Sequence, residues 1–257
     1  MRNKKLKSFY NKVYRKGEGK HYTKLVLDKK KITDEKIEIL KEVSWKGKEV
    51  VDIGCGTGEL AYCIAARGAK KVIGIDYSRE AINIAKKEYQ LKDLFYECKD
   101  FNKISGKFDV IVMAGVLEHI DNPYLFLKKA KRILNKKGFI IITCPNWSNA
   151  RGYILLTLKE LFGLRITLTD IHYFTPLEFE AWGKKLGMKL SWRTFEQDWG
   201  HGGKMIKDFE KRLPKLLKGS GKKEKIKKFI KWLKIHAPEL EEDQKASGAV
   251  GLYHFKK

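Results

Sequence analysis

The stretch Val50–Leu60, VVDIGCGTGEL, constrains the fold of this chain more than any other. It begins as a short apolar run ending at Asp52, which is typical of a buried parallel strand. Glycines then alternate along a turn, and the apolar residues that follow predict a helix. In a doubly wound sheet, such a strand, turn and helix receive a nucleotide-like ligand at the strand's carboxyl end. Glu59 stands where the dinucleotide pattern G-x-G-x-x-G needs a small residue, which argues against that pattern.

Four further segments predict strands at the spacing of a doubly wound sheet. Val72–Asp76 ends in an acid eighteen residues after Gly58. A carboxylate at that place can accept hydrogen bonds from the two hydroxyls of a ribose. The other three predicted strands are Leu94–Glu97, Phe108–Met113 and Gly138–Thr143.

The alternating glycines after an acidic strand end resemble motif I of the class I S-adenosylmethionine (SAM) methyltransferases. The five predicted strands follow in the order of that superfamily, and the resemblance covers residues 49–195 and a closing strand at 250–255. It implies an α/β fold, with a doubly wound, Rossmann-like, mostly parallel sheet of seven strands and helical lid insertions. A doubly wound domain that binds some other ligand is the alternative.

The resemblance also implies which residues bind SAM as the co-substrate. Asp52 would orient its amino-acid end, the glycine turn would let backbone amides approach, and Asp76 would hold the ribose. Tyr77 would lie against the adenine, and Asp100 with Phe101 would complete the adenine site. The full predicted set is Asp52, Gly54, Cys55, Gly56, Gly58, Asp76, Tyr77, Asp100, Phe101, Met113 and Val116.

The loop 113–122, MAGVLEHIDN, follows the fourth predicted strand and is where reacting groups are expected. Its Glu118-His119-Ile120 resembles a frequent E-H-I element of the small-molecule branch, which includes ubiquinone-pathway (type 11–12-like) enzymes. His119 is a candidate base because an imidazole titrates in the right pH range, although a purely structural histidine is the alternative. In the ubiquinone-pathway enzymes the segment reads E-x-x-E-H, with acids associated with a metal. Gly115 replaces the first acid here, so we expect no metal site.

A second candidate base, His172, precedes a predicted helix start. Thr175, Pro176 and Glu178 form the pattern of a capping box. The pattern around His172 is similar to one in the same small-molecule branch, and the alternative is a structural histidine that holds the lid.

The predicted organisation is an N-terminal helical cap, 1–48, followed by a SAM-binding domain, 49–257. In the cap, Tyr14 and Tyr22 are expected either to close over the cofactor or to pack as ordinary aromatics. The domain carries a lid insertion at 147–172, with a helix over 150–171, and a basic helical insertion at 199–247. Two apolar stripes in the second insertion predict helices that pack on the core and lid, or alternatively one helix that lies in a membrane interface.

The net charge of +24 is unevenly distributed. Residues 1–48 and 204–234 each carry a surplus of ten positive charges, and all other residues together carry only four. This indicates a basic surface beside the catalytic core, with solvated helix faces as the alternative reading. The four cysteines are scattered, no apolar stretch is long enough to span a membrane, and no secretory signal is present, so we expect a cytoplasmic protein.

These patterns predict a SAM-dependent methyltransferase that acts on an oxygen or nitrogen of a small-molecule or lipid-like acceptor. An anionic acceptor and peripheral membrane contact would fit the lysine-rich segments. RNA or protein as the acceptor is the alternative, because lysines bind phosphates without regard to sequence. A non-catalytic binding protein and an aminopropyl transferase are less favoured, since motif I is intact and no dense acidic site is present.

Overall fold

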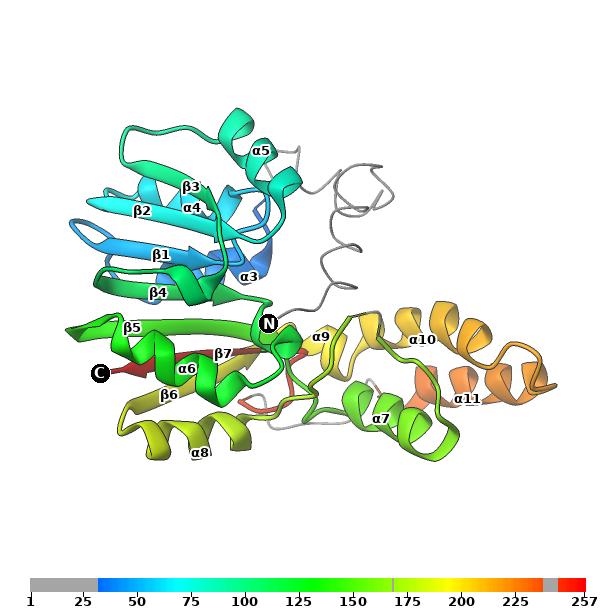
Figure 1. Ribbon diagram of the computed structural model, residues 1–257. Helices are drawn as coiled ribbons and strands as arrows, with labels where there is room; N and C mark the ends of the chain where they lie inside the picture. Colours follow the sequence, from blue (N-terminus) through cyan, green and yellow to red (C-terminus); the bar gives the residue numbers. More distant parts are fainter. Residues whose placement is uncertain (1–31, 168, 238–244) are drawn as a thin grey trace. The chain divides into compact units, whose positions relative to one another are not determined.

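The computed structural model describes residues 32–167, 169–237 and 245–257, and its centre is a seven-stranded sheet (Figure 1). The strand order is β3-β2-β1-β4-β5-β7-β6. The strands are β1 Glu49–Ile53, β2 Lys71–Asp76, β3 Leu94–Cys98, β4 Phe108–Ala114, β5 Leu134–Pro145, β6 Lys189–Phe195 and β7 Val250–Lys256. The expectations for residues 1–31, including Tyr14 and Tyr22, lie outside the described residues.

Parallel pairing joins β1 to β2 and β4, β2 to β3, and β4 to β5. The chain therefore moves outward from β1 to one side through β2 and β3, then returns to begin the other side with β4. Such a reversal leaves a crevice at the carboxyl ends of β1 and β4 in doubly wound sheets. Central strands are apolar without alternation because both sheet faces are covered, as at the fully buried Val110–Val112 and Ile140–Ile142. The predicted α/β fold is confirmed.

The chain divides into two compact units. The described part of unit 1 runs to Thr143 and also includes Trp182–Ser191 and Tyr253–Lys257. Most of its helices begin at side-chain caps: the Ser78 hydroxyl accepts from the Ala81 amide (3.3 Å), and Asn122 accepts from the Leu125 amide (3.0 Å). The helix that follows Gly58 has no side-chain cap. These helices are α3 Asp34–Lys41, α4 Glu59–Ala65, α5 Arg79–Glu88 and α6 Pro123–Arg132.

The described part of unit 2 covers Cys144–Ala181 and Trp192–Leu252 and is mostly helical. Helices α7 (Ala150–Phe162), α10 (Gly203–Leu216) and α11 (Lys223–His236) share one hydrophobic cluster, and a short α9 (Gln197–Gly200) precedes α10. The cluster includes Trp147, Leu155, Met205, Phe209, Leu213, Ile230 and Leu233. Both apolar stripes predicted at 205–217 and 226–233 are therefore packed together with α7, which confirms their predicted packing on the lid helix. Their packing on the core of the sheet stays a prediction.

Two boundaries differ from the sequence prediction. The helix expected over 150–171 ends at Phe162, because Gly163 adopts the left-handed conformation (φ 62°) and its amide caps the Leu158 and Lys159 carbonyls. Strand β5 starts four residues earlier than predicted, at Leu134, with a register irregularity opposite Phe108 and Val110.

The capping box at Thr175 is confirmed. The Thr175 amide and hydroxyl both donate to Glu178 Oε2, at 2.8 and 2.7 Å, and helix α8 (Pro176–Leu186) follows. None of the helices in the described ranges is both long and apolar enough to cross a bilayer.

Candidate active site

The glycine turn after β1 is fastened to the end of β2. The amides of Gly54 and Cys55 both donate to the Ile75 carbonyl, at 2.8 and 3.0 Å, and the Gly56 amide donates to Asp76 Oδ2 at 3.1 Å. The carboxyl ends of the two strands thus form one backbone-rich surface. Burial raises the pKa of the Cys55 thiol well above its usual value, so this side chain is a neutral wall of the turn.

Because two glycines of the turn lack a Cβ atom, neighbouring side chains pack directly against their backbone. At Gly54, where φ is +73°, an added Cβ would lie 2.6 Å from Val116 Cγ2. At Gly58 an added Cβ would lie 2.6 Å from the Tyr96 hydroxyl, which donates to the Gly58 carbonyl at 2.9 Å. The first contact brings the loops after β1 and β4 together, as the predicted cofactor site requires.

Asp52 is a buried carboxylate that lacks a full set of partners. It is 2% exposed, and its Oδ2 has no hydrogen-bond partner among the described residues. Burial raises its pKa from 3.8 to about 7, the Lys36 cation opposes that shift, and the Asp76 carboxylate adds to it. A buried acid in this condition is stabilised by a cation brought to it. The ammonium group of SAM is such a cation, so the residues present fit this co-substrate.

Asp76 is engaged by backbone amides on both oxygens. Oδ1 accepts from the Ser78 amide at 2.8 Å, and Oδ2 accepts from the Gly56 amide at 3.1 Å. Burial raises its pKa, and the hydrogen bonds from Ser78, Gly56 and Tyr77 oppose the rise. The carboxylate is thus fixed at the end of β2, with Tyr77 half-buried beside it. The roles predicted for both residues toward ribose and adenine stay predictions.

Helix α3 supplies charged groups that the sequence analysis did not identify. The Lys36 ammonium pairs with the buried Glu59 of the glycine motif, and Glu35 Oε1 accepts from the buried Thr143 hydroxyl at 2.6 Å. These contacts hold α3 to α4 and to the end of β5. The sequence contains only two weak signals for these contacts. Lys36 follows shortly after the start of one predicted helix, and Glu59 is the only acid at the start of the apolar helix after the glycine turn.

Phe101 and Asp100, both predicted to bind adenine, differ in their exposure to solvent. Phe101 is buried, with its ring 4.0 Å from that of Phe126 and the Lys129 ammonium 5.4 Å from its centre. Asp100, immediately before it, is exposed. Phe101 therefore has a packing role in unit 1, and its predicted contact with adenine stays a prediction.

The loop after β4 holds the first candidate base. Met113 is fully buried at the end of β4, and a short 3-10 helix, η2 (Leu117–His119), follows Val116. His119 Nε2 lies 4.0 Å from Oε1 of the buried Glu118, and the His119 side chain is largely buried. The imidazole of His119 and the carboxylate of Glu118 are therefore neighbours in the loop after β4.

The second candidate base, His172, belongs to unit 2. Its ring stacks on Phe174 with 5.2 Å between centroids and 14° between planes. The structure brings Asp52, Asp76 and Val116 together around the glycine turn, and it places His119 in that same unit. In the parts of the chain that the structure describes, no group of three His, Cys, Asp or Glu side chains is arranged to hold a metal.

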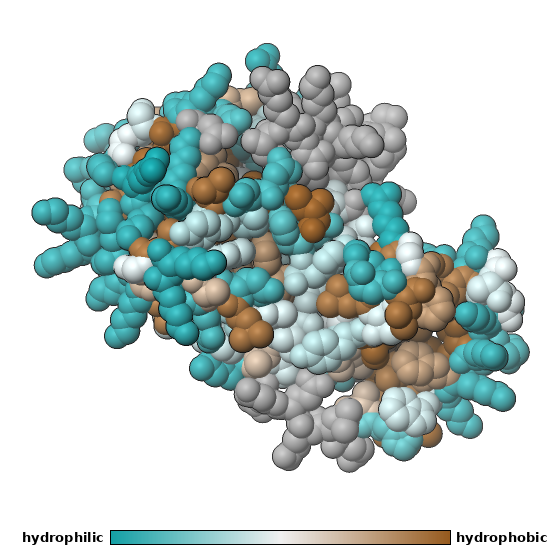
Figure 2. Space-filling view, turned by 60° about the horizontal axis from the view of Figure 1, so that its bottom comes forward, coloured by the Kyte–Doolittle hydropathy of each residue, from teal (hydrophilic) through white to brown (hydrophobic). Residues whose placement is uncertain are grey.

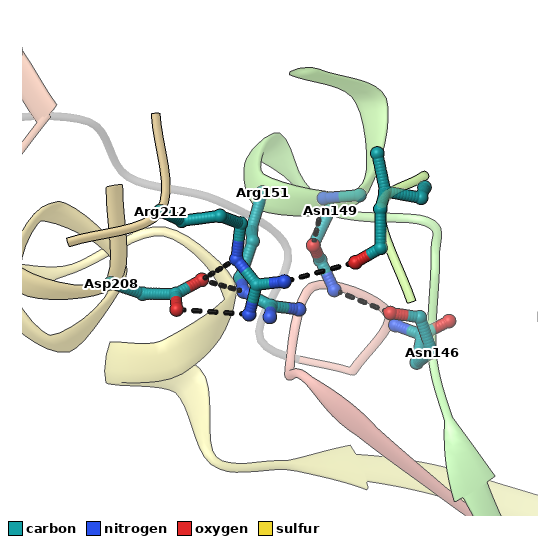
Figure 3. Close-up of polar contacts among 7 residues, drawn as sticks. Asn146, Asn149, Arg151, Asp208 and Arg212 are labelled. Carbon is teal, nitrogen blue, oxygen red and sulfur yellow. Dashed lines mark hydrogen bonds and ion pairs between the residues drawn. The ribbon is translucent and has the colours of Figure 1, made fainter. Parts of the chain in front are cut away.

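Unit 2 contains a polar network that connects the start of α7 to α10 (Figure 3). Arg212 forms two hydrogen bonds with Asp208, both at 3.0 Å, and Arg151 Nε donates to the same carboxylate at 3.1 Å. Burial would raise the pKa of Asp208, but the two arginines hold it below its usual value. Asn149 caps α7 by accepting from Gly152 at 2.8 Å. The network joins residues about sixty positions apart, so local pattern did not reveal it.

A family model described as a methyltransferase domain matches residues 27–191. A doubly wound sheet with this glycine turn and two acids at the ends of β1 and β2 defines a SAM-binding fold of the class I type. The chain belongs to the methyltransferase-domain family, and it is a class I SAM-dependent methyltransferase.

Two curated relatives and one solved structure are similar to the chain. A ubiquinone biosynthesis O-methyltransferase of Coxiella burnetii is 28% identical over 161 residues, covering 59% of this chain and 68% of that protein. A Methanocaldococcus jannaschii protein named for a protein N5-glutamine methyltransferase activity is 30% identical over 162 residues, covering 58% and 79%. The crystal structure of a SAM-dependent methyltransferase from Thermotoga maritima aligns with a TM-score of 0.59 at 19% identity, covering 96% and 99%.

Proposed function

We propose that this methyltransferase transfers the methyl group of SAM to an oxygen or nitrogen atom of a small-molecule or lipid-like acceptor. The observation that carries the co-substrate site is the buried, incompletely bonded Asp52 beside a glycine turn that is hydrogen-bonded to the end of β2. The similarity to the ubiquinone biosynthesis enzyme supports the acceptor class.

The residues of the β1 and β2 ends would bind and orient the co-substrate. Asp52 would bind its ammonium group and Asp76 its ribose hydroxyls, with Tyr77, Asp100 and Phe101 toward the adenine. The bound sulfonium supplies an electrophilic methyl carbon, which an acceptor attacks in line. Because such a displacement depends mainly on alignment, holding the two reactants close and excluding water would provide most of the rate.

The acceptor atom must lose a proton if it arrives as a hydroxyl or an ammonium. His119 would accept that proton, and the neighbouring buried Glu118 would stabilise the resulting imidazolium. His172 is the second candidate base. The segments 147–172 and 199–247 would supply the predicted lid and basic insertion, and an acceptor with an acidic group would suit the lysines of the second segment.

A protein acceptor is the second candidate. It is favoured by the similarity to the relative named for N5-glutamine methylation. RNA is a further alternative, because lysine contacts to phosphates supply affinity without sequence preference.

Methyl transfer from radiolabelled SAM into a cell extract would separate these candidates. After the reaction, the extract is divided into small-molecule, lipid, protein and RNA fractions, and a reaction without the protein serves as the control. We expect label in the small-molecule or lipid fraction. Label confined to protein or RNA would overturn the proposed acceptor class while leaving the methyltransferase assignment intact.

A further inference from the structure

Helix α11 presents a second face, opposite its buried stripe, that combines lysines with large apolar side chains. At 100° per residue, Lys225, Lys228, Lys231, Trp232 and Ile235 fall within an arc of about 120°. Ile230 and Leu233, on the other side, are buried in the helical cluster. Trp232 is 53% exposed and Ile235 57% exposed. The helix is therefore apolar on both sides, and among the described residues of unit 2 only the inner side packs in the hydrophobic cluster.

The C-terminal end of α7 adds two more exposed apolar side chains next to the start of α11. Leu161 is 72% exposed and Phe162 57% exposed. The Lys222 ammonium lies 5.2 Å from the centre of the Phe162 ring, so this end of α7 adjoins the beginning of α11. In Figure 2, apolar atoms lie exposed among hydrophilic ones in the part of the molecule that holds these helices.

Among the residues that the structure describes, only two lysines of α11 form ion pairs. The helix contains six lysines and one glutamate. Lys227 pairs with Glu224 at 2.8 Å, and Lys234 pairs with Glu210 at 2.5 Å. Lys225, Lys228 and Lys231 are exposed and have no ion pair among the residues that the structure describes. The outer face of α11 is thus a cationic surface that also exposes an aromatic and an aliphatic side chain.

This combination favours one kind of partner. A helix face that is simply exposed to solvent is well served by lysines. Exposed tryptophan, phenylalanine, leucine and isoleucine side chains do not stabilise such a face. A single-stranded nucleic acid would use the aromatic rings for stacking, but Leu161 and Ile235 offer no ring to a base. The interface of an anionic bilayer accepts all of these groups, because apolar side chains enter the region below the headgroups while lysines remain with the lipid phosphates.

We propose that the outer face of α11, formed by Lys225, Lys228, Lys231, Trp232 and Ile235, docks on a membrane that contains anionic lipids, with Leu161 and Phe162 at the end of α7 as further contacts. The apolar stripe of α11 stays in the helical cluster, and the outer face and the end of α7 make the contact. This surface is distinct from the co-substrate site of unit 1 and goes beyond the proposed methyl transfer. An enzyme held there would act on molecules that reside in or near the bilayer.

Vesicle co-sedimentation of the full chain tests the proposal. We expect binding to vesicles of phosphatidylcholine with phosphatidylglycerol, weak binding to phosphatidylcholine alone, and release at high salt. Replacing Lys225, Lys228 and Lys231 by Gln should weaken binding about a hundredfold, because each lysine near such a surface contributes about a fivefold factor. A Phe162→Ser and Trp232→Ser double variant should weaken it at least about tenfold.

Phe95→Ser is the matched control. Phe95 is 48% exposed in unit 1 and has the Lys71 ammonium 5.7 Å from its ring centre, so it offers the same chemistry in another place. Its loss should leave vesicle binding unchanged, and all variants should keep the SAM affinity of the parent. The proposal is overturned if the parent does not bind anionic vesicles, if Phe95→Ser weakens binding as much as the double variant, or if the surface binds single-stranded RNA and ignores vesicles.

Discussion

The replacement Asp52→Asn removes a buried negative charge with almost no change of shape. Burial holds the pKa of Asp52 at about 7 in the folded chain, compared with 3.8 ordinarily. The folded state therefore keeps its proton to a higher pH than the unfolded state. Stability that depends on this group is highest below pH 3.8 and is lost as the pH rises toward 7. Asparagine does not ionise, so it avoids the free-energy cost of burying a carboxylate. The variant should therefore be more stable than the parent.

The size of the gain follows from the shift. About three pKa units at 1.36 kcal/mol each give about 4 kcal/mol of cost at a pH of about 8.5, where Asp52 is ionised in both states. At about pH 5 the folded parent has already taken up the proton and only the unfolded chain is ionised, so the cost is about 2 kcal/mol. Other titrating groups cancel in the comparison, because they are the same in both proteins.

Urea unfolding of parent and variant without SAM, at about pH 5 and about pH 8.5, measures this difference. We expect the advantage of the variant to double between the two pH values. The control is Asp109→Asn: burial raises the pKa of Asp109, but hydrogen bonds from the Glu49 amide and Asn135 outweigh that and leave it lowered. This control should lose stability by a similar amount at both pH values. If Asp52→Asn is less stable than the parent at the higher pH, or its advantage does not change with pH, the account of this carboxylate is wrong.

Three further outcomes are expected. Gly54→Ala should weaken SAM binding at least about tenfold, because the added Cβ meets Val116 and the φ of +73° is unfavourable for alanine. Adding Val116→Ala should restore part of the folding stability. A full return of SAM affinity in the double variant would show that the backbone conformation at Gly54 does not matter for binding. Asp76→Ala should weaken SAM binding by at least about tenfold in calorimetry, and an unchanged affinity would remove its ribose assignment. Thr175→Ala should cost about 1 kcal/mol of unfolding free energy through the lost cap of α8, with no effect on SAM affinity.

The sequence predicted those parts of the fold that depend on residues close together in the chain. The buried strands, the glycine turn and the capping box at Thr175 each depend on neighbouring residues, and all are present. The resemblance also placed Gly54 and Val116 in one predicted SAM-binding set, and the structure brings these two residues close together. Even the end of α7 had a local signal in Gly163, although the apolar residues after it obscured that signal.

The groups that the sequence analysis missed are joined over long distances along the chain. Lys36 meets Glu59, Tyr96 closes over Gly58, and Arg151 shares Asp208 with Arg212. No periodicity links such residues, because their pairing is decided by how separate helices and strands pack. The burial of Phe101 against Phe126 is of the same kind, since an aromatic residue after a strand suits a ligand or a core equally well.

Isothermal titration of SAM into the parent chain and into Asp52→Asn tests the central claim most directly. The parent should bind SAM at about pH 8 and lose about tenfold in affinity at about pH 6, because Asp52 then carries a proton in most molecules. The variant should bind weakly at both values with little pH dependence. Equal affinity of the two proteins at the higher pH, or no binding by the parent, would contradict the claim that this carboxylate and the turn beside it hold the co-substrate.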